Sequence, residues 1–324
     1  MASSDDARWL AAAAALAERG RPLSHPNPSV GAILVNKGRV IARGWTQPGG
    51  RPHAEALALQ AAGEAARGAT LYVSLEPCAH ASSRGPDCAG LVAASGVERV
   101  VVGCGDPDPR TAGQGIERIR QAGIAIESLA SPECAAGLGG YLLRTLLGRP
   151  RVTLKLALSQ DGYLAPPQGQ WLTGPEARAH VHAWRARMDA ILVGRGTFLA
   201  DAPRLDVRLP GLEDRSPQRW LLSRGEAPEG WHALPSPRDI ALLLPAQELM
   251  VEGGAETARA FLVAGLVDRM MLYRAPLSVG GSGPCLPELT REALAETSEW
   301  RLLATHQLGK DSLDVYERQP CSPE

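Results

Sequence analysis

Short apolar runs alternate with amphipathic stretches along the first half of the chain. The stretch before Gly20 has the spacing of an amphipathic helix, and a proline-rich turn follows at residues 25–29. Further along, apolar runs predict strands at 30–35, 39–45, 71–75, 97–103 and 124–127, and helical spacing predicts helices at 53–67, 88–95, 114–122 and 132–147. Strands that alternate with helices favour a three-layer α/β domain.

A second α/β pattern begins after Gly148-Arg149-Pro150, which predicts one domain at 1–148 and another at 149–324. We expect strands at 152–158, 190–193, 249–251, 269–273 and two more within 300–318, with helices at 176–187 and from the residue after Gly254 through about 264. Thr173 is placed to cap the first of these helices. Residues 159–162 predict a turn, and residues 166–170 and 225–240 predict loops.

Composition narrows the classes of protein that fit. The 324 residues carry a net charge of −1, and no basic stripe is present, which argues against a nucleic-acid-binding protein. Six scattered cysteines fit a reducing cytosol with one metal site better than a disulfide framework. No segment has the length and hydropathy of a membrane span, and acidic residues precede the alanine run at 11–15, unlike a signal peptide. We therefore expect a soluble, cytoplasmic protein.

One group of residues carries recognisable chemistry. His53-Ala54-Glu55 is followed by Pro77-Cys78 and then by Cys88. One imidazole and two thiolates suit zinc, and a catalytic zinc site leaves its fourth position to water. A His-x-Glu motif followed by Pro-Cys is typical of zinc deaminases, whose glutamate moves protons without binding the metal. We expect His53 and Cys78 to lie at the starts of helices, where the helix dipole favours a thiolate at Cys78.

The motifs of the two halves together resemble a known family. The first half contains HPNPSVGAILV, PHAEALAL, TLYVSLEPCAH and a DPDP loop, and the second contains KLALSQDG, WLTGPEAR, DAILVGRGTFLADAPRLDVR and VEGG. In this order and spacing the chain resembles the bifunctional enzymes of riboflavin biosynthesis, in which a pyrimidine deaminase is fused to a pyrimidine reductase. The resemblance covers most of the chain. It implies a cytidine-deaminase-like domain followed by a domain with the dihydrofolate-reductase fold.

The resemblance also implies two reactions and their cofactors. The first is the zinc-dependent hydrolytic deamination of 2,5-diamino-6-ribosylamino-4(3H)-pyrimidinone 5′-phosphate. The second is the reduction of the ribosyl side chain to ribityl by NADPH. Carried over to this sequence, the zinc ligands are His53, Cys78 and Cys88, the proton carrier is Glu55, and the substrate contacts are Asn27, His80 and Asp106. A homo-oligomer that acts on a small phosphorylated pyrimidine is expected.

In the second half the resemblance implies two further sets of residues. Those matching substrate-contacting positions are Trp171, Arg185, Leu205, Arg208 and Glu252. Those matching cofactor-contacting positions are Ala157, Thr173, Thr197, Asp201, Gly253 and Gly254. Apart from the resemblance, two glycines directly before a helix favour phosphate binding, because they let a phosphate approach the free backbone N–H groups of the first turn. The two arginines suit a substrate phosphate, which accepts charge-assisted hydrogen bonds.

The chain departs from the family pattern at several positions. The two zinc cysteines are usually one residue closer, and Asp87 stands where the second is expected. Thr46, Asp108 and Gly169 replace a histidine, an asparagine and a serine that are usual in the family. The segment between about 224 and 250 is shorter than usual, and Ser223-Arg224 replaces an Asp-Ser or Asp-Thr pair.

These departures leave alternatives open. Asp87 is a poorer third zinc ligand than Cys88, but the sequence permits either. A deaminase with a degenerate reductase domain, serving a related pteridine- or deazaflavin-like pathway, is the alternative to the bifunctional enzyme. A nucleic-acid-editing deaminase fits the neutral charge and the second half poorly. A closed structural zinc site would have four protein ligands and no use for Glu55.

Overall fold

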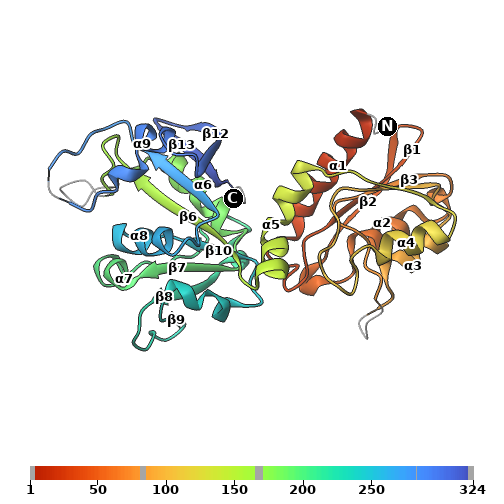
Figure 1. Cartoon of the computed structure of the whole chain (residues 1–324), viewed down its shortest axis with the longest axis horizontal. Coiled ribbons are helices and arrows are strands. Elements are labelled where there is room, and N and C mark those ends of the chain that lie inside the picture. Colours follow the sequence, from red (N-terminus) through yellow and green to blue (C-terminus); the bar gives the residue numbers. More distant parts are fainter. Residues whose placement is uncertain (1–3, 81–84, 165–170, 282, 320–324) are drawn as a thin grey trace. The chain divides into compact units, whose positions relative to one another are not determined.

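The computed structural model describes residues 4–80, 85–164, 171–281 and 283–319, and it divides the chain into two compact units, Met1–Gly148 and Arg149–Glu324 (Figure 1). The expected loop at 166–170, with Gly169, and the cysteine at position 321 lie outside the described residues. Within those residues, none of the helices combines the length and the apolar character that a membrane span requires.

The first unit is built on a mixed five-stranded sheet. Its strands, in spatial order, are β2 (Arg39–Trp45), β1 (Gly31–Asn36), β3 (Thr70–Val73), β4 (Arg99–Val102) and β5 (Ala125–Ser128). Strand β1 runs antiparallel to β2 and β3, whereas β3, β4 and β5 are parallel. The carboxyl ends of β3 and β4 therefore meet at one edge of the sheet, where the loops that follow them come together.

Helices cover both faces of this sheet (Figure 1). Helices α1 (Ser4–Ala17) and α5 (Pro132–Leu147) lie on one side, and α2 (Ala54–Ala62), α3 (Cys88–Ala94) and α4 (Gln114–Gln121) lie on the other. The alternation of side chains along β1 explains the two layers, because Ile33 packs with the α1 side and Leu34 packs with the α2 side. The expected three-layer α/β domain is confirmed.

The second unit is built on an eight-stranded sheet. Its strands, in spatial order, are β12 (Trp300–Leu308), β13 (Asp311–Arg318), β11 (Arg269–Arg274), β6 (Arg151–Leu158), β10 (Glu248–Val251), β7 (Ala190–Gly194), β8 (Gln218–Leu222) and β9 (His232–Leu234). The six strands from β11 to β9 are parallel, and β13 is antiparallel to both of its neighbours.

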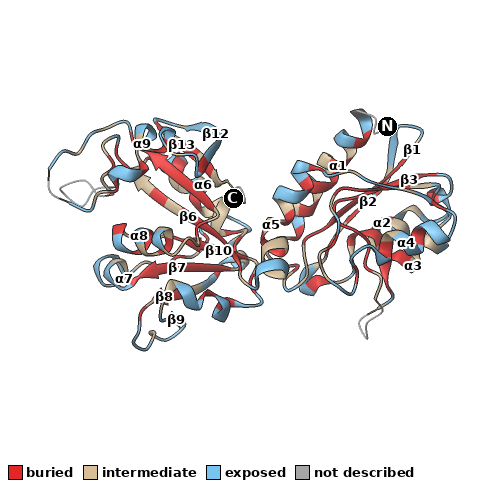
Figure 2. Ribbon diagram, viewed as in Figure 1, coloured by how far each residue is buried: buried red, intermediate tan, exposed pale blue. Residues whose placement is uncertain are grey.

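Helices pack on both faces of this sheet too. They are α6 (Pro175–Arg185), α7 (Arg195–Asp201), α8 (Ala255–Val263) and α9 (Arg291–Ala295). Helix α8 packs through Phe261 against the face that carries Leu154, and α6 packs through Val181 against the face that carries Tyr273. Figure 2 shows the central strands buried between helices whose outer surfaces are exposed. The layering and the mixed sheet agree with the dihydrofolate-reductase-like fold expected from the resemblance.

Several local expectations for the second unit are wrong. Residues 225–240 are not all loop, because β9 pairs in parallel with β8 and a 3₁₀ helix spans Pro237–Leu243. The imidazole of His232 stacks on Trp220 at a ring distance of 4.8 Å, a cross-strand contact that local sequence does not reveal. Helix α7 was not expected.

The expected cap of α6 is also wrong. Thr173 does not cap the helix. The N-cap is Gly174, which makes no side-chain cap bond, and its backbone N–H instead donates to the Asp311 carboxylate at 2.6 Å. The long helix expected at 53–67 is an α-helix only to Ala62 and continues as a 3₁₀ turn at Gly63–Ala66.

Candidate active sites

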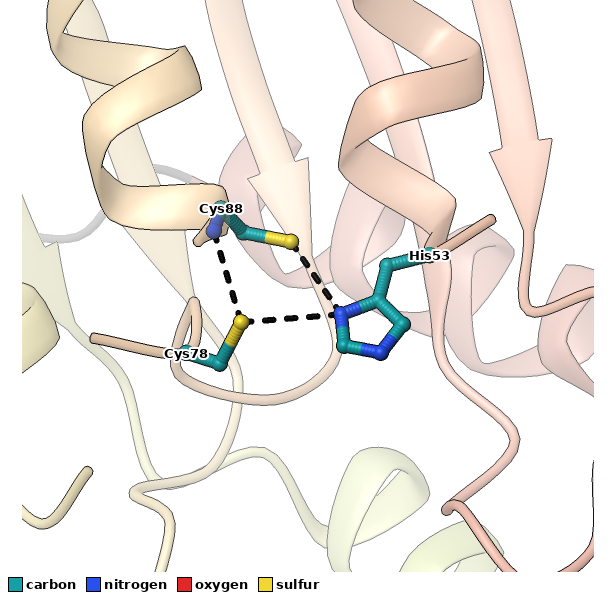
Figure 3. Close-up of side chains that lie close together, drawn as sticks. All are labelled: His53, Cys78 and Cys88. Carbon is teal, nitrogen blue, oxygen red and sulfur yellow. Dashed lines mark hydrogen bonds between the residues drawn. The ribbon is translucent and has the colours of Figure 1, made fainter. Parts of the chain in front are cut away.

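His53, Cys78 and Cys88 come together at the edge of the first sheet (Figure 3). The Nδ1 atom of His53 lies 3.2 Å from Cys88 Sγ and 3.6 Å from Cys78 Sγ, and the three possible ligand atoms all lie within 4.8 Å of one another. In a tetrahedral zinc site, bond lengths of about 2.0–2.1 Å to nitrogen and 2.3 Å to sulfur place these atoms roughly 3.6 Å apart. The donor set and its spacing therefore fit a zinc ion.

Only two of the three residues lie at helix starts, and Cys78 is not one of them. His53 is the N-cap of α2, and Cys88 is the first residue of α3, whereas Cys78 lies in the loop after β3. The backbone N–H of Cys88 donates to Cys78 Sγ at 3.3 Å, so the positive end of α3 still acts on that sulfur. The side chain of Cys88, then the His53 ring and this N–H, lower the pKa of Cys78 to about 4 against the effect of burial.

Asp87 is engaged elsewhere, which favours Cys88 as the third ligand. The Asp87 carboxylate caps α3 by accepting the backbone N–H of Gly90 at 2.6 Å. It also accepts a hydrogen bond of 2.8 Å from the guanidinium of Arg118. Both contacts use Oδ1, and the cap fixes the side chain beside its own helix. Asp87 thus serves as a helix cap, and the sulfur of the next residue, Cys88, lies among the three possible ligand atoms.

Glu55 lies beside the three possible ligands in the first turn of α2, and only 3 % of it is exposed. Burial raises the pKa of its carboxyl above the ordinary value, and the nearby His53 opposes this rise. Helix α2 approaches β2 closely at Gly44, where an added Cβ would lie 2.3 Å from the carbonyl oxygen of Ala54. A glycine at this position therefore lets the first turn of α2, with Glu55, reach the sheet.

A pocket of about 290 Å³ opens onto this group, and its lining includes Asn27, Thr46, His80 and Asp106. The Asn27 amide nitrogen lies 3.1 Å from His53 Nε2. The Nδ1 atom of His80 lies 3.4 Å from the Thr111 hydroxyl. The structure thus brings all three of the expected substrate contacts to the pocket that holds His53 and Glu55.

Two pocket-lining residues that the sequence did not single out hold the pocket in shape. The buried carboxylate of Glu76 accepts hydrogen bonds from four backbone N–H groups, those of Asp106, Gly113, Gly115 and Ile116, at 3.0–3.3 Å. The hydroxyl of Tyr141 donates to Asp106 Oδ1 at 2.6 Å. A glutamate directly before Pro77-Cys78 was the only sequence signal, because its partners are 30 to 40 residues away.

In the second unit, Glu252 and Arg185 form a partly buried pair at the carboxyl end of β10. Arg185 donates through Nε at 2.7 Å and through Nη2 at 3.0 Å, and Lys155 Nζ lies 3.5 Å from the same carboxylate. Burial opposes ionisation, yet the charges of Lys155 and Arg185 lower the pKa of Glu252 to about 2. Lys155 was not expected as a site residue, although a lysine within an apolar strand was a signal.

Thr197 and the two glycines meet at the start of α8. The Gly254 backbone N–H donates to the Thr197 hydroxyl at 3.1 Å, and Gly254 is the N-cap of α8. An added Cβ at Gly253 would lie 2.4 Å from Cβ of Thr257. Gly253 is thus required for the close turn that joins β10 to α8, and the N-terminus of the helix lies beside Thr197.

The remaining residues expected in the second site are more scattered. Trp171 is 78 % exposed, Leu205 is buried with a φ of 54°, and Arg208 pairs with Asp206 at 3.5 Å. Ala157 lies on β6, Asp201 ends α7, and Thr173 precedes the N-cap of α6. The structure does not bring all of these into one contact cluster.

The chain matches two family models. Residues 3–104 match the cytidine and deoxycytidylate deaminase zinc-binding region, and residues 150–230 and 244–313 match the RibD C-terminal domain. Taken with the His-Cys-Cys group and the two sheets, these matches define a deaminase of the zinc-binding class fused to a reductase domain. The second match is interrupted at residues 231–243.

Relatives of known function extend over nearly the whole chain. The riboflavin biosynthesis protein RibD of Escherichia coli (strain K12) is 36 % identical, and the match covers 94 % of this chain and 97 % of that protein. A structure of Acinetobacter baumannii RibD has 34 % identity and a TM-score of 0.85, and the Thermotoga maritima deaminase/reductase has 27 % identity and a TM-score of 0.84. Each structural match covers 97 % of this chain and 99 % of the other.

The chain belongs to the RibD family of riboflavin biosynthesis proteins. It is a bifunctional enzyme with a zinc-dependent deaminase activity and an NADP-dependent reductase activity. The family resemblance inferred from the sequence motifs is confirmed.

Proposed function

We propose that the chain deaminates 2,5-diamino-6-ribosylamino-4(3H)-pyrimidinone 5′-phosphate and then reduces the ribosyl chain of the product to ribityl with NADPH. The similar Thermotoga maritima protein is described as a diaminohydroxyphosphoribosylaminopyrimidine deaminase and 5-amino-6-(5-phosphoribosylamino)uracil reductase. The observation that carries the proposal is the grouping of His53, Cys78 and Cys88 around one point, with Glu55 buried beside them.

In the first step, His53, Cys78 and Cys88 would hold Zn²⁺, which supplies an activated water at neutral pH. Glu55 is the group available to accept a proton from that water and to return it to the leaving amine. Its raised pKa suits both halves of this transfer, because a carboxyl that titrates nearer to neutral pH exchanges protons more readily in both directions.

Contacts in the second unit support the reductase step. Gly254 and Thr197 lie at the amino end of α8, where backbone N–H groups suit a cofactor phosphate. Arg185 and Lys155 surround Glu252 and leave a net positive charge that suits the phosphorylated substrate. NADPH supplies the hydride, and these residues bind and orient the two reactants.

Separate assays of the two half-reactions test the proposal. Ammonia release should require zinc, and a chelator should abolish it. NADPH oxidation with substrate that is already deaminated should continue in the presence of the chelator. Reduction that stops when zinc is removed would contradict independent sites.

Glu55→Gln tests the assignment of the proton carrier. The amide keeps the volume of the side chain but cannot exchange a proton. We expect ammonia release to fall by about 10²–10⁴-fold while zinc content stays at one per chain. Near-normal ammonia release from this variant would exclude the proposed role of Glu55.

The alternative, a deaminase with a degenerate reductase domain, is motivated by the short segment between about 224 and 250. Against it, β9 retains its parallel pairing with β8, so the shortened segment still ends the sheet with a strand. Calorimetric titration with NADPH decides between the two. We expect binding by the natural chain and much weaker binding by Gly254→Asp, whose carboxylate would repel a phosphate. If neither protein binds at millimolar NADPH, the alternative is correct.

Three expectations about context remain predictions. Light scattering tests the homo-oligomer, cell fractionation tests the cytoplasmic location, and a nucleic-acid binding assay tests the expected lack of such partners.

A further inference from the structure

An ion pair in the loop after β4 lines the deaminase pocket. Both oxygens of the Asp108 carboxylate accept from Nε of Arg110, at 3.0 and 3.1 Å, and Oδ2 also accepts from Nη2. The backbone N–H of Arg110 donates to the same carboxylate at 3.0 Å. Both residues line the pocket that contains His53 and Glu55. The Asp108–Arg110 ion pair is therefore a local contact within one loop and does not join distant elements.

The two ends of the pocket differ in exposure. The Glu55 and Cys78 end is buried, at 3 % and 8 % exposed, whereas the Arg110 side chain is 69 % exposed and that of Asp108 is 17 % exposed. The reacting ring must reach the buried end, where the metal ligands and Glu55 lie. The Asp108–Arg110 pair therefore lines the pocket away from its buried end, on the side that is open to solvent.

The net charge at the exposed end of the pocket depends on the Asp108–Arg110 ion pair. An unpaired Asp108 would place a negative charge beside any anionic substituent, and the two like charges would repel each other. Hydrogen bonding by Arg110 holds the pKa of Asp108 below its ordinary value, so this carboxylate remains charged. The negative charge of Asp108 must therefore be balanced by a cation, because the carboxylate does not become protonated near neutral pH.

The arginine side chains of this pocket can do more than balance the charge of Asp108, because they can also donate hydrogen bonds to a ligand. The hydrogen bonds from Arg110 to Asp108 use Nε and Nη2, and a guanidinium has five N–H donors, so the two on Nη1 are left for a ligand. Arg51 and Arg144 line the same pocket. Planar guanidinium groups match the geometry of phosphate oxygens.

We propose that the Asp108–Arg110 pair is the element by which the deaminase pocket selects a phosphorylated substrate. Arg110 cancels the charge of Asp108 and donates to the phosphate, while Asp108 fixes the direction of the guanidinium. This inference rests on the proposed deamination and adds to it the residue that recognises the phosphate end.

The test compares the phosphorylated pyrimidine with the same compound lacking its phosphate, as substrates for ammonia release. For Arg110→Ala we expect kcat/KM to fall about tenfold or more with the phosphorylated compound, mainly through KM, and less than twofold with the other. A tenfold change corresponds to about 1.4 kcal/mol. Asp108→Asn in the Arg110→Ala background should recover part of the loss, because it removes the uncompensated charge.

Arg110→Lys is the matched control, because lysine keeps the positive charge but lacks the planar guanidinium. We expect its loss of kcat/KM with the phosphorylated compound to be intermediate. Equal losses with both compounds would overturn the proposal, because they would mean that the pair only shapes the loop. An unchanged preference for the phosphate would overturn it as well. If the natural chain releases no ammonia from either compound, the proposed function fails. In that case calorimetric binding of the two compounds to the natural chain and to Arg110→Ala still decides whether Arg110 selects the phosphate.

Discussion

Substitutions at adjacent positions 87 and 88 separate the role of a metal ligand from that of a helix cap. We expect Asp87→Ala to keep one zinc per chain and Cys88→Ser to lose it on dialysis. The reason is that the Asp87 carboxylate is bound to Gly90 N–H and to Arg118, whereas Cys88 Sγ lies 3.2 Å from His53 Nδ1.

The cost of Asp87→Ala can be estimated from these contacts. Loss of an N-cap aspartate costs about 0.5–2 kcal/mol. The ion pair with Arg118, whose side chain is half exposed, adds about 0–1 kcal/mol. The sum is roughly 0.5–3 kcal/mol. A domain of this size loses about 2–4 °C of melting temperature per kcal/mol. Asp87→Ala should therefore melt earlier but still bind zinc and release ammonia.

Zinc content by metal analysis, together with thermal unfolding, provides the assay. Cys134→Ser is the matched control, because this cysteine is buried beside α1 away from the metal ligands and should leave zinc unchanged. Retention of zinc by Cys88→Ser, with loss in Asp87→Ala, would refute the assignment and make the carboxylate the third ligand.

Two further predictions concern the walls of the pocket. Each Glu76 carboxylate oxygen accepts from two backbone N–H groups, so in Glu76→Gln the amide NH2 would face two donors. This should cost about 2–6 kcal/mol, measured by following loss of ammonia release in a urea titration, and an unchanged midpoint would contradict it. In Tyr141→Phe the pKa of Asp106 should rise further, because the hydroxyl hydrogen bond lowers it. The acid limb of the pH profile for ammonia release should then move to higher pH, and an unmoved limb would mean that Asp106 does not titrate in the reaction.

The grouping of His53, Cys78 and Cys88 could be predicted from the sequence, because zinc chemistry restricts both residue type and spacing. A histidine two residues before a glutamate, followed by two cysteines, has few structural explanations. The sequence could not decide whether Asp87 or Cys88 is the third zinc ligand, because the two residues are adjacent and both fit the expected spacing. The start of α3 favours Cys88, because the side chain of Asp87, the residue directly before the helix, accepts the cap hydrogen bond from Gly90.

Residues that depend on distant partners escaped prediction. Glu76 accepts from N–H groups of a loop that is 30 to 40 residues away, and Lys155 meets Glu252 from a strand almost 100 residues earlier. The expectation that Cys78 starts a helix failed for the same reason. Its sulfur is stabilised by the first N–H of α3, which belongs to Cys88. A local pattern predicts elements, but it does not predict which loop lies against which helix.

Parallel strand order explains why the residues of each unit gather where they do. Cys78 follows β3 and Asp106 follows β4, and these parallel neighbours end at the same edge of the first sheet. In the second unit, Thr197 follows β7 and Glu252 follows β10, which are again parallel neighbours. Loops beyond the carboxyl ends of parallel strands are free to vary without disturbing the sheet. The segment between β8 and β10 lies beyond such strand ends, and these strands keep their pairing. A change of length in that segment can therefore leave the turn before α8 in place.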